Sequence, residues 1–336
     1  MIAITGISGL AGANLARALL ARGQTVRGLI HNDRRAVVGL ELELVEANIR
    51  DFDSLVRAFE GADVVYHLAA AISLSMNSWQ EVEAVNVQGT RNVVEACLRC
   101  GVRRLVHFST VHAIQKEPFD QPLVESRPRV SSANGSPYDY SKALGEQIVH
   151  EGISRGLQAV ILNPTGMIGP YDYYPSFFGQ GLLAMVSGRV PALVEGGFDW
   201  VDVRDVVQAA LCAAEVAPNG SSYILSGHWR SIRQISELAA RLTGTNAPLM
   251  TVPMGLAELA APLMIRLAHF TGGKPIYTRA TLDALRSNRH VSSARAEHEL
   301  GYSSRPFEET LADTLAWFHQ NGYLKLSTKP GSTGYG

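Results

Sequence analysis

The first twelve residues constrain the fold more than any other part of this chain. An apolar stretch at residues 2–5 runs straight into Gly6, Gly9 and Gly12, and an alanine- and leucine-rich stretch follows as far as Arg22. This succession predicts a strand, a turn and a helix: Gly6 turns the chain, Gly9 lets backbone approach a pyrophosphate, and Gly12 allows close helix packing. The N–H groups and the positive dipole end of the helix would face the anion. We therefore expect a dinucleotide-binding loop here.

Short apolar strands alternate with helical patterns through the first half of the chain. The expected strands are residues 2–5, 26–30, 42–45, 64–67, 105–109 and 159–162. The alternation predicts an α/β fold, with a Rossmann-type doubly wound parallel sheet and helices on both faces. Ligands bind at the carboxyl ends of such strands, so the loops 6–12, 67–73 and 109–112 should form the site.

The pattern changes after Pro164, where turn-forming and aromatic residues replace the alternation. We expect a dinucleotide-binding domain over residues 1–165, followed by a smaller, interleaved C-terminal substrate-binding lobe. The lobe should comprise residues 166–198 and 227–325, with segments near 199–226 returning to the sheet. Residues 326–336, rich in Gly, Ser and Thr, are expected to form a flexible tail.

Composition and charge exclude several classes of protein. The 336 residues carry a net charge of -1 and no basic run, which argues against nucleic acid or a membrane surface as a partner. Three cysteines, two of them the isolated pair Cys97 and Cys100, favour neither a disulfide framework nor a zinc site, so no metal is expected. The apolar stretch 255–270 is interrupted and too short to span a bilayer. Because the first strand begins at residue 2, no room remains for a signal peptide, and we expect a cytoplasmic protein.

A second motif, Tyr138-Asp-Tyr-Ser-Lys142, carries the candidate chemistry. Tyr138 and Lys142 are four residues apart, so on a helix their side chains point the same way and the ammonium lies near the phenol oxygen. We expect the cation to lower the phenol pKa from its ordinary value of about 10 toward neutrality. A tyrosine tuned in this way can donate and accept protons.

Together these motifs resemble those of one family over residues 1–325. The matching segments are Thr5–Gly12, similar to TGxxGxxG; His67–Ala70, similar to HxAA; Asn86–Thr90, similar to NxxGT; Phe108–Thr110 at the end of the fifth strand; and Asn163–Pro170 after the sixth. The chain resembles the extended short-chain dehydrogenases/reductases, also called the NAD-dependent epimerase/dehydratase superfamily, and within them the dihydroflavonol reductase-like branch.

The resemblance implies roles for individual residues. Tyr138 would be the catalytic acid/base, Lys142 would bind the nicotinamide ribose, and Thr110 would hydrogen-bond the substrate oxygen, with Ser109 as the rival for that hydroxyl. Asn86 would hold a water in the proton path. The cofactor-binding residues implied are Gly6, Ser8, Gly9, Leu10, Gly12, His31, Arg34, Asn48, Ile49, Leu68, Ala69, Ala70, Asn86, Ser109, Tyr138, Lys142, Asn163 and Pro164.

The end of the second strand bears on the choice between NADP and NAD. NAD-preferring enzymes place a carboxylate there to bind the ribose hydroxyls, whereas Ile30-His31-Asn32 offers none, and Asp33 comes later. His31, Arg34 and Arg35 would supply donors and positive charge to a 2′-phosphate. We expect NADP(H) to be favoured over NAD(H); the alternative is that these basic residues form a solvated turn.

The expected substrate region is aromatic and almost uncharged. The candidate substrate-binding residues are His112, Met167, Tyr171, Tyr174, Phe178 and Phe198. A pocket of this composition favours an apolar or aromatic ketone or aldehyde as the small-molecule substrate. For His112, a satisfied loop histidine is the equal alternative. The sequence therefore favours an NAD(P)-dependent carbonyl reductase or alcohol dehydrogenase.

Two other functions compete with this one. A nucleotide-sugar epimerase or dehydratase would use the same scaffold, but Val111-His112 stands where dehydratases tend to carry an Asp-Glu pair, and Phe198 where epimerases tend to carry a phosphate-binding arginine. A non-catalytic NADP-binding sensor would usually lack the tyrosine or the lysine, and this chain has both. A homodimer through helices 90–100 and 138–154 is what the family implies.

Overall fold

The computed structural model describes residues 1–336 apart from 32, 73–78, 191, 249, 272–278 and 326–336. For residues 263–271 and 279–280 it describes the course of the backbone alone. The expected flexible tail, 326–336, thus lies outside the described residues.

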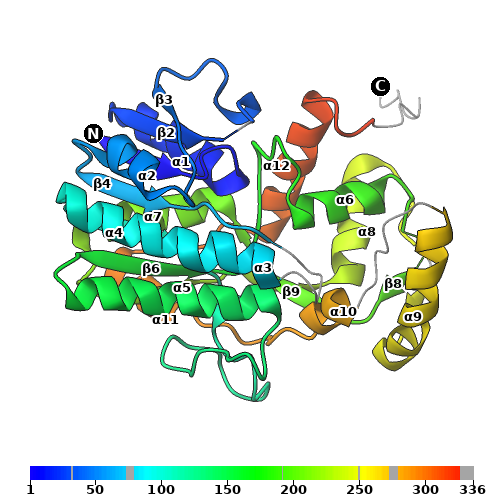
Figure 1. The fold of residues 1–336 in the computed structure, drawn as a ribbon. Coiled ribbons are helices and arrows are strands. Elements are labelled where there is room, and N and C mark those ends of the chain that lie inside the picture. The colour runs from blue at the N-terminus through cyan, green and yellow to red at the C-terminus, as the bar shows by residue number, and fades with distance from the viewer. Residues whose placement is uncertain (32, 73–78, 191, 249, 272–278, 326–336) are drawn as a thin grey trace.

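A seven-stranded parallel sheet forms the centre of the molecule (Figure 1). Its strands are β1 (Ile2–Thr5), β2 (Val26–Ile30), β3 (Glu43–Glu46), β4 (Val64–His67), β5 (Arg104–Phe108), β6 (Ala159–Pro164) and β10 (Ser222–Leu225). They are ordered β10-β6-β5-β4-β1-β2-β3. The order in which successive strands are added to the sheet reverses at β1, which pairs with β2 on one side and β4 on the other. Such a switch point is where α/β sheets bind ligands.

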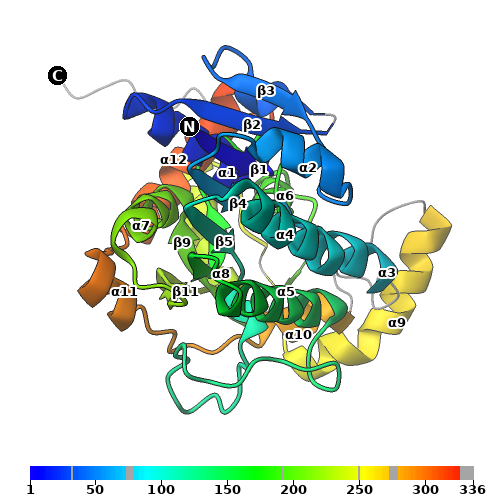
Figure 2. The same cartoon turned by 60° about the vertical axis from the view of Figure 1, so that its left-hand side comes forward.

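Helices cover both faces of this sheet (Figure 2). One face packs on α1 (Leu10–Ala21), α7 (Val203–Val216) and α11 (Ala294–Leu300), and the other on α2 (Phe52–Phe59), α4 (Thr90–Cys100) and α5 (Pro137–Ser154). Successive strand residues alternate between the two cores: Ile4 belongs to the first and Ala3 to the second. Both faces of the strands are therefore buried except in the edge strand β3, which is why the other strands read as continuous apolar runs. The expected α/β doubly wound fold is confirmed.

The second half of the chain adds smaller elements beside the sheet. They are β7 (Gly166–Ile168), α6 (Phe177–Val186), β8 (Leu193–Val194), β9 (Gly197–Asp202), β11 (His228–Ser231), α8 (Ile232–Thr243), β12 (Thr251–Val252), α9 (Met254–Thr271), α10 (Arg279–Leu285) and α12 (Phe307–Gln320). They share an apolar core of their own, which includes Phe198, Trp200 and Phe318. None of the helices in the described part of the chain is long and apolar enough to cross a membrane.

One segment expected to return to the main sheet does so, and another does not. β10 pairs with β6 in the main sheet, whereas β9 pairs with β7 and β11 in a separate three-stranded sheet. β9 ends at Asp202 because its carboxylate accepts a hydrogen bond from the backbone N–H of Arg204 and caps α7. The division of the chain into a dinucleotide-binding domain and a substrate lobe remains a prediction.

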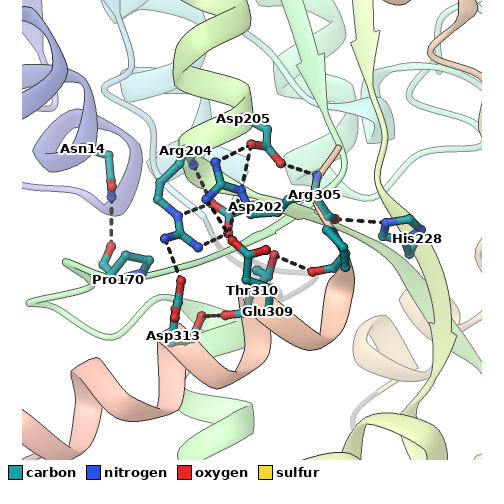
Figure 3. A network of polar contacts seen from close by, with 12 residues as sticks. Asn14, Pro170, Asp202, Arg204, Asp205, His228, Arg305, Glu309, Thr310 and Asp313 are labelled. Carbon is teal, nitrogen blue, oxygen red and sulfur yellow. Dashed lines mark hydrogen bonds and ion pairs between the residues drawn. The ribbon is translucent and has the colours of Figure 1, made fainter. Parts of the chain in front are cut away.

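Charged residues fasten α12 to the corner after β9 (Figure 3). Arg305 donates two hydrogen bonds to Asp205, at 2.9 and 2.7 Å. Arg204 bridges Asp202 and Asp313, each at 2.7 Å. Because the side chain of Asp202 is fully buried, removing its partner would leave an uncompensated charge inside the protein. These ion pairs therefore fix α12 against the end of β9 and the start of α7.

Candidate active site

The glycine loop has the geometry of a phosphate cradle. Gly6 has a φ of +71°, and a Cβ on it would lie 2.6 Å from the backbone nitrogen of Ala69. A Cβ on Gly12 would lie 2.3 Å from the carbonyl oxygen of Gly6, so neither position admits a side chain. At Gly9, by contrast, a Cβ would meet only the Gly6 oxygen, at 3.5 Å. Gly9 precedes α1 without any side-chain cap, which leaves the first N–H groups of the helix free for an anion.

A buried hydrogen-bond chain holds the neighbouring loop after β4. The hydroxyl of Thr5 accepts hydrogen bonds from the backbone N–H groups of Leu68 and Ala69 and contacts His67 Nδ1 at 2.8 Å. His67 Nε2 lies 3.1 Å from the hydroxyl of Thr90, which donates to the Asn86 carbonyl. Because the Thr90 hydroxyl donates its hydrogen to Asn86, Nε2 is the donor in its contact with Thr90. The Thr5 hydroxyl already accepts two hydrogen bonds and donates its own hydrogen to Nδ1, so the imidazole is neutral. Burial lowers the pKa of His67 to about 3, in agreement with this assignment.

Thr110, Tyr138 and Lys142 meet at the carboxyl end of β5. Tyr138 lies in the first turn of α5, which Ser136 and Asp139 begin with a capping box. The Thr110 side chain lies beside its hydroxyl and acts to lower its pKa. Lys142, one turn further on, is buried and donates from Nζ to the Phe108 carbonyl oxygen at 2.7 Å. The structure thus brings together the three residues that the sequence grouped as catalytic.

The pKa of the phenol differs from the expectation. Burial raises the pKa of Tyr138, and the neighbouring Thr110 side chain only partly opposes this effect. Burial also lowers the pKa of Lys142 to about 8, with Glu146 acting in the opposite direction. The expected lowering of the phenol pKa by Lys142 is therefore not found, because burial and the negative charge of Asp139 both raise it. The hydroxyl stays protonated at neutral pH and is a proton donor.

The two adjacent hydroxyls, Ser109 and Thr110, have different surroundings. Thr110 contacts Tyr138 and also accepts a hydrogen bond from the backbone N–H of His112 at 3.3 Å. The Ser109 hydroxyl is buried and has no hydrogen-bond partner among the residues that the structure describes. His112 itself is half-buried. The geometry therefore pairs Thr110 with Tyr138 and leaves the Ser109 hydroxyl available to a ligand.

Asn86 makes contacts other than the expected one to water. Its amide nitrogen donates to the Ala71 carbonyl and to the Ser141 hydroxyl, both at 2.9 Å, and its oxygen accepts from the Ala71 N–H at 2.8 Å. It lies in a π-helical turn, η2 (Glu83–Gly89), between α3 (Trp79–Val82) and α4. These contacts tie the loop after β4 to helix α5, and both amide N–H groups are occupied.

The remaining cofactor candidates line the same edge of the sheet. Asn48 and Ile49 follow β3, and Asn48 Oδ1 accepts a hydrogen bond from the Arg50 N–H. Ser8 and Leu10 flank Gly9, Ala70 is exposed in the loop after β4, and Asn163 and Pro164 end β6, where both are buried. The structure therefore places these candidates at the carboxyl ends of the strands, around the switch point beside β1.

In the segment after β2, Asp33 and Arg35 pair with each other, whereas His31 and Arg34 are exposed. Asp33 and Arg35 form an ion pair at 2.6 Å, and this pairing lowers the pKa of Asp33. Arg35 begins the short helix η1 (Arg35–Val37). His31 and Arg34 are exposed, and among the described residues no hydrogen bond or ion pair holds the Arg34 guanidinium. Asn32 lies outside the described residues.

The aromatic candidates do not gather around Tyr138. Tyr171, with a φ of +68°, packs on the guanidinium of Arg17 in α1, 4.3 Å from the ring centre. Tyr174 packs on Arg35 at 5.6 Å. These two residues therefore contact α1 and η1, and their expected role in binding substrate stays a prediction. The cation–π contacts decide their position.

Phe198 and Phe178 are packed in the C-terminal core. The Phe198 ring lies 5.0 Å from that of Phe178 and 5.6 Å from that of Trp200, all edge to face. Phe198 is buried, so its contacts are those of a core residue. Met167, in β7, is half-buried against the core of the main sheet. The aromatic stripe in the sequence was therefore largely core packing.

Sequence reasoning missed one buried charged residue at the site. Glu146 accepts hydrogen bonds from Arg129 Nε at 2.5 Å and from Asn163 Nδ2 at 2.6 Å. Asn163, predicted as a cofactor contact, also donates to the Thr110 carbonyl at 3.0 Å. The spacing of Glu146, four residues after Lys142, was the available signal, because it places both on one face of α5.

Comparisons with known proteins show the family of this chain. The profile of the NAD dependent epimerase/dehydratase family matches residues 2–225. The chain is 36% identical over 328 residues to sterol demethylase protein B of Methylococcus capsulatus, covering 96% of this chain and 99% of that protein. It is 30% identical to a putative dihydroflavonol 4-reductase of Synechocystis sp., covering 96% and 95%. The crystal structure of PA4631, a nucleoside-diphosphate-sugar epimerase from Pseudomonas aeruginosa, superimposes with a TM-score of 0.79 at 26% identity, covering 96% and 99%.

The chain belongs to the NAD dependent epimerase/dehydratase family, whose members are the extended short-chain dehydrogenases/reductases. It is an NAD(P)-dependent oxidoreductase of this type, as its sequence resemblance implied.

Proposed function

We propose that this protein interconverts a ketone or aldehyde and the corresponding alcohol on an apolar or aromatic small molecule. The observation that carries the proposal is the grouping of Thr110 and Tyr138 with the buried Lys142, at the strand ends where this family binds its cofactor. A phenol that stays protonated at neutral pH suits the direction of reduction, in which the carbonyl oxygen needs a proton.

The chain offers a fitting place for the nicotinamide cofactor. The free N–H groups at the start of α1, the space at Gly9 and the unpartnered hydroxyl of Ser109 are the features that fit it. Gly6, Gly9 and Gly12 would hold the pyrophosphate, and Lys142 the nicotinamide ribose. When bound, the cofactor supplies the hydride.

The residues of the chain divide the remaining work. Tyr138 would give its hydroxyl proton to the carbonyl oxygen, and Thr110 would donate a hydrogen bond to the oxygen as its negative charge develops. Lys142, held by the Phe108 carbonyl, would stabilise the phenolate that remains on Tyr138. Its charge thus assists the reaction when the proton has left, although it does not lower the phenol pKa in the structure.

The preference for an apolar substrate rests on two kinds of support. The matched relatives are named as proteins of sterol and dihydroflavonol metabolism. Phe198 is buried in an apolar core where the epimerase pattern calls for an arginine, and an aromatic ring cannot neutralise a diphosphate.

A nucleotide-sugar epimerase is the second candidate function. The family is named for epimerases and dehydratases, and PA4631, which has a similar fold, is named as a nucleoside-diphosphate-sugar epimerase. Val111 and His112 occupy the short helix η3 (Val111–Ala113) directly after Thr110, where a dehydratase would need acidic groups. A non-catalytic sensor is the least supported candidate function, since the chain retains Thr110, Tyr138 and Lys142.

We also propose that NADP(H) is favoured over NAD(H). Asp33 is the nearest carboxylate after β2, and its charge is offset by Arg35. Arg34 is exposed and would be available to a 2′-phosphate.

Net cofactor consumption distinguishes the candidate reactions. The purified protein should consume NADPH in proportion to alcohol formed from a panel of aryl and polycyclic ketones, and should leave UDP- and dTDP-sugars unchanged. An epimerase returns its hydride within one turnover, so the absorbance of added NADPH would stay constant. Conversion of a nucleotide sugar without net NADPH loss would overturn the proposal.

A further inference from the structure

Glu146 is an acidic residue buried beside the catalytic lysine. It is 1% exposed. One carboxylate oxygen accepts a hydrogen bond from Asn163 Nδ2 at 2.6 Å, and the other accepts from Arg129 Nε at 2.5 Å. Glu146 lies one turn beyond Lys142 on α5. A buried carboxylate is costly unless it is paired, so these partners account for how the protein tolerates it.

Through Asn163, Glu146 also controls the backbone of Thr110. The same amide nitrogen of Asn163 that donates to Glu146 donates to the Thr110 carbonyl at 3.0 Å. The Thr110 side chain meets the Tyr138 hydroxyl. A displacement of the Asn163 amide would therefore shift the hydroxyl that faces the reacting oxygen.

Of the described titratable groups around Lys142, Glu146 is the one whose charge favours the ammonium form. Lys142 is surrounded by Tyr138 and Glu146 on its own helix, His67 on β4 and His107 on β5. The two histidines are buried with pKa values far below neutrality, and the pKa of Tyr138 is raised, so all three are uncharged at neutral pH. Among the described residues, Glu146 is the group whose charge favours the Lys142 ammonium.

We propose that Glu146 is a positioning residue that keeps Lys142 protonated and holds Thr110 in place, and that it does so independently of its bond to Arg129. The inference rests on the proposed function, since it assigns the roles of Lys142 and Thr110. Glu146 touches neither substrate nor cofactor in this account; it acts through its neighbours.

The alternative is that Glu146 only anchors the segment containing Arg129. Arg129 also donates from NH1 to the Glu125 and Arg127 carbonyls, so it shapes the segment that precedes α5. In that case either partner of the ion pair should matter equally. The two readings therefore differ in what happens when Arg129 is replaced and Glu146 is kept.

Three variants separate the two readings. Glu146→Gln removes the charge with little change of shape. Arg129→Gln breaks the same ion pair but keeps the carboxylate. Glu151→Gln is the matched control, because it removes one negative charge from an exposed position on the same helix. Two quantities are measured from pH 6.5 to 9.5: kcat/KM for ketone reduction, and the NADPH dissociation constant by fluorescence, which needs no substrate.

Glu146→Gln should move the loss of activity at alkaline pH, and the weakening of NADPH binding, to a pH about one unit lower, because an adjacent opposite charge changes a pKa by about that amount. Arg129→Gln and Glu151→Gln should not lower either midpoint. If Glu146→Gln does not fold, as thermal melting would show, Glu146→Asp takes its place and should retain the wild-type midpoints.

Equal displacement of the midpoints in Glu146→Gln and Arg129→Gln would overturn the inference, as would unchanged midpoints in Glu146→Gln or lowered ones in a Glu146→Asp replacement. If the wild-type protein reduces no carbonyl compound, the proposed reaction fails, and the NADPH binding curves still decide the role of Glu146.

Discussion

Lys142 shows at the scale of one residue how a catalytic group opposes stability. Its ammonium is buried and has one hydrogen bond, to the Phe108 carbonyl. Burial lowers its pKa from 10.5 to about 8. The unfolded chain therefore binds a proton more readily than the folded protein, which costs stability below about pH 8. As the pH rises from about 8 to 10.5, this cost disappears.

Lys142→Met should therefore stabilise the protein while abolishing turnover. One pKa unit corresponds to about 1.4 kcal/mol, so after the lost hydrogen bond we expect a gain of about 2 kcal/mol in the free energy of unfolding at pH 7. The gain should shrink between pH 8 and 10.5. Urea unfolding at several pH values measures it, and a variant that is less stable than wild type at pH 7 would contradict the buried-charge account.

The hydroxyls of Ser109 and Thr110 should differ in catalysis. Thr110→Val keeps the shape but removes the hydroxyl that meets Tyr138, and should lower kcat by about 100-fold. Ser109→Ala removes a hydroxyl without a described partner and should mainly raise the KM for the cofactor. Steady-state kinetics compares the two. A larger loss of kcat in Ser109→Ala would exchange their roles.

At the scale of an element, the start of α1 contains one glycine that close packing requires, Gly12, and one that packing does not require, Gly9. Gly12 lies against the backbone of Gly6, whereas a Cβ on Gly9 would make only an ordinary contact with the Gly6 oxygen at 3.5 Å. The close packing at Gly12 fixes the helix on the strand, and the looser packing at Gly9 leaves room for a phosphate. The two glycines therefore separate folding from binding within one turn.

Gly12→Ala should destabilise the protein by about 3 kcal/mol, because the added methyl collides with backbone that cannot move aside. Gly9→Ala should cost less than about 1 kcal/mol and weaken NADPH binding at least tenfold. Thermal melting and fluorescence titration give both quantities. Unchanged NADPH affinity in Gly9→Ala would remove the phosphate from this loop.

Much of the fold, and the grouping of the candidate residues Thr110, Tyr138 and Lys142, could be predicted from the sequence because local patterns specify them. The glycine loop, the strands and the Tyr138–Lys142 spacing depend on neighbours within a few residues, and the sheet then brings the strand ends together. The positions of Tyr171 and Tyr174 could not be predicted. They depend on Arg17 and Arg35, which come from distant parts of the chain.

Electrostatics was the other unpredictable part. The effect of Lys142 on Tyr138 depends on how far both are desolvated, and that follows from the packing of the complete molecule. The spacing of a motif gives the partners but not their environment. Glu146, four residues beyond Lys142, illustrates the same limit: its importance depends on Asn163 and Arg129.

For the whole molecule, we expect the choice of cofactor to depend on charges at one edge of the sheet. Arg34→Ala should weaken NADPH binding about tenfold and leave NADH binding unchanged, because only NADPH carries the 2′-phosphate. Titration of both cofactors against wild type and variant provides the measurement, with NADH as the internal control. Equal losses for both cofactors would return this segment to a solvated turn.

The most direct test of the account is hydride transfer in Tyr138→Phe. With saturating NADPH and a ketone that wild type reduces, single-turnover reduction should be slower by on the order of a thousandfold, because only the proton-donating oxygen is removed. The NADPH dissociation constant should stay within about twofold of wild type. Retention of more than about a tenth of the wild-type rate would contradict the assignment of Tyr138 as the proton donor.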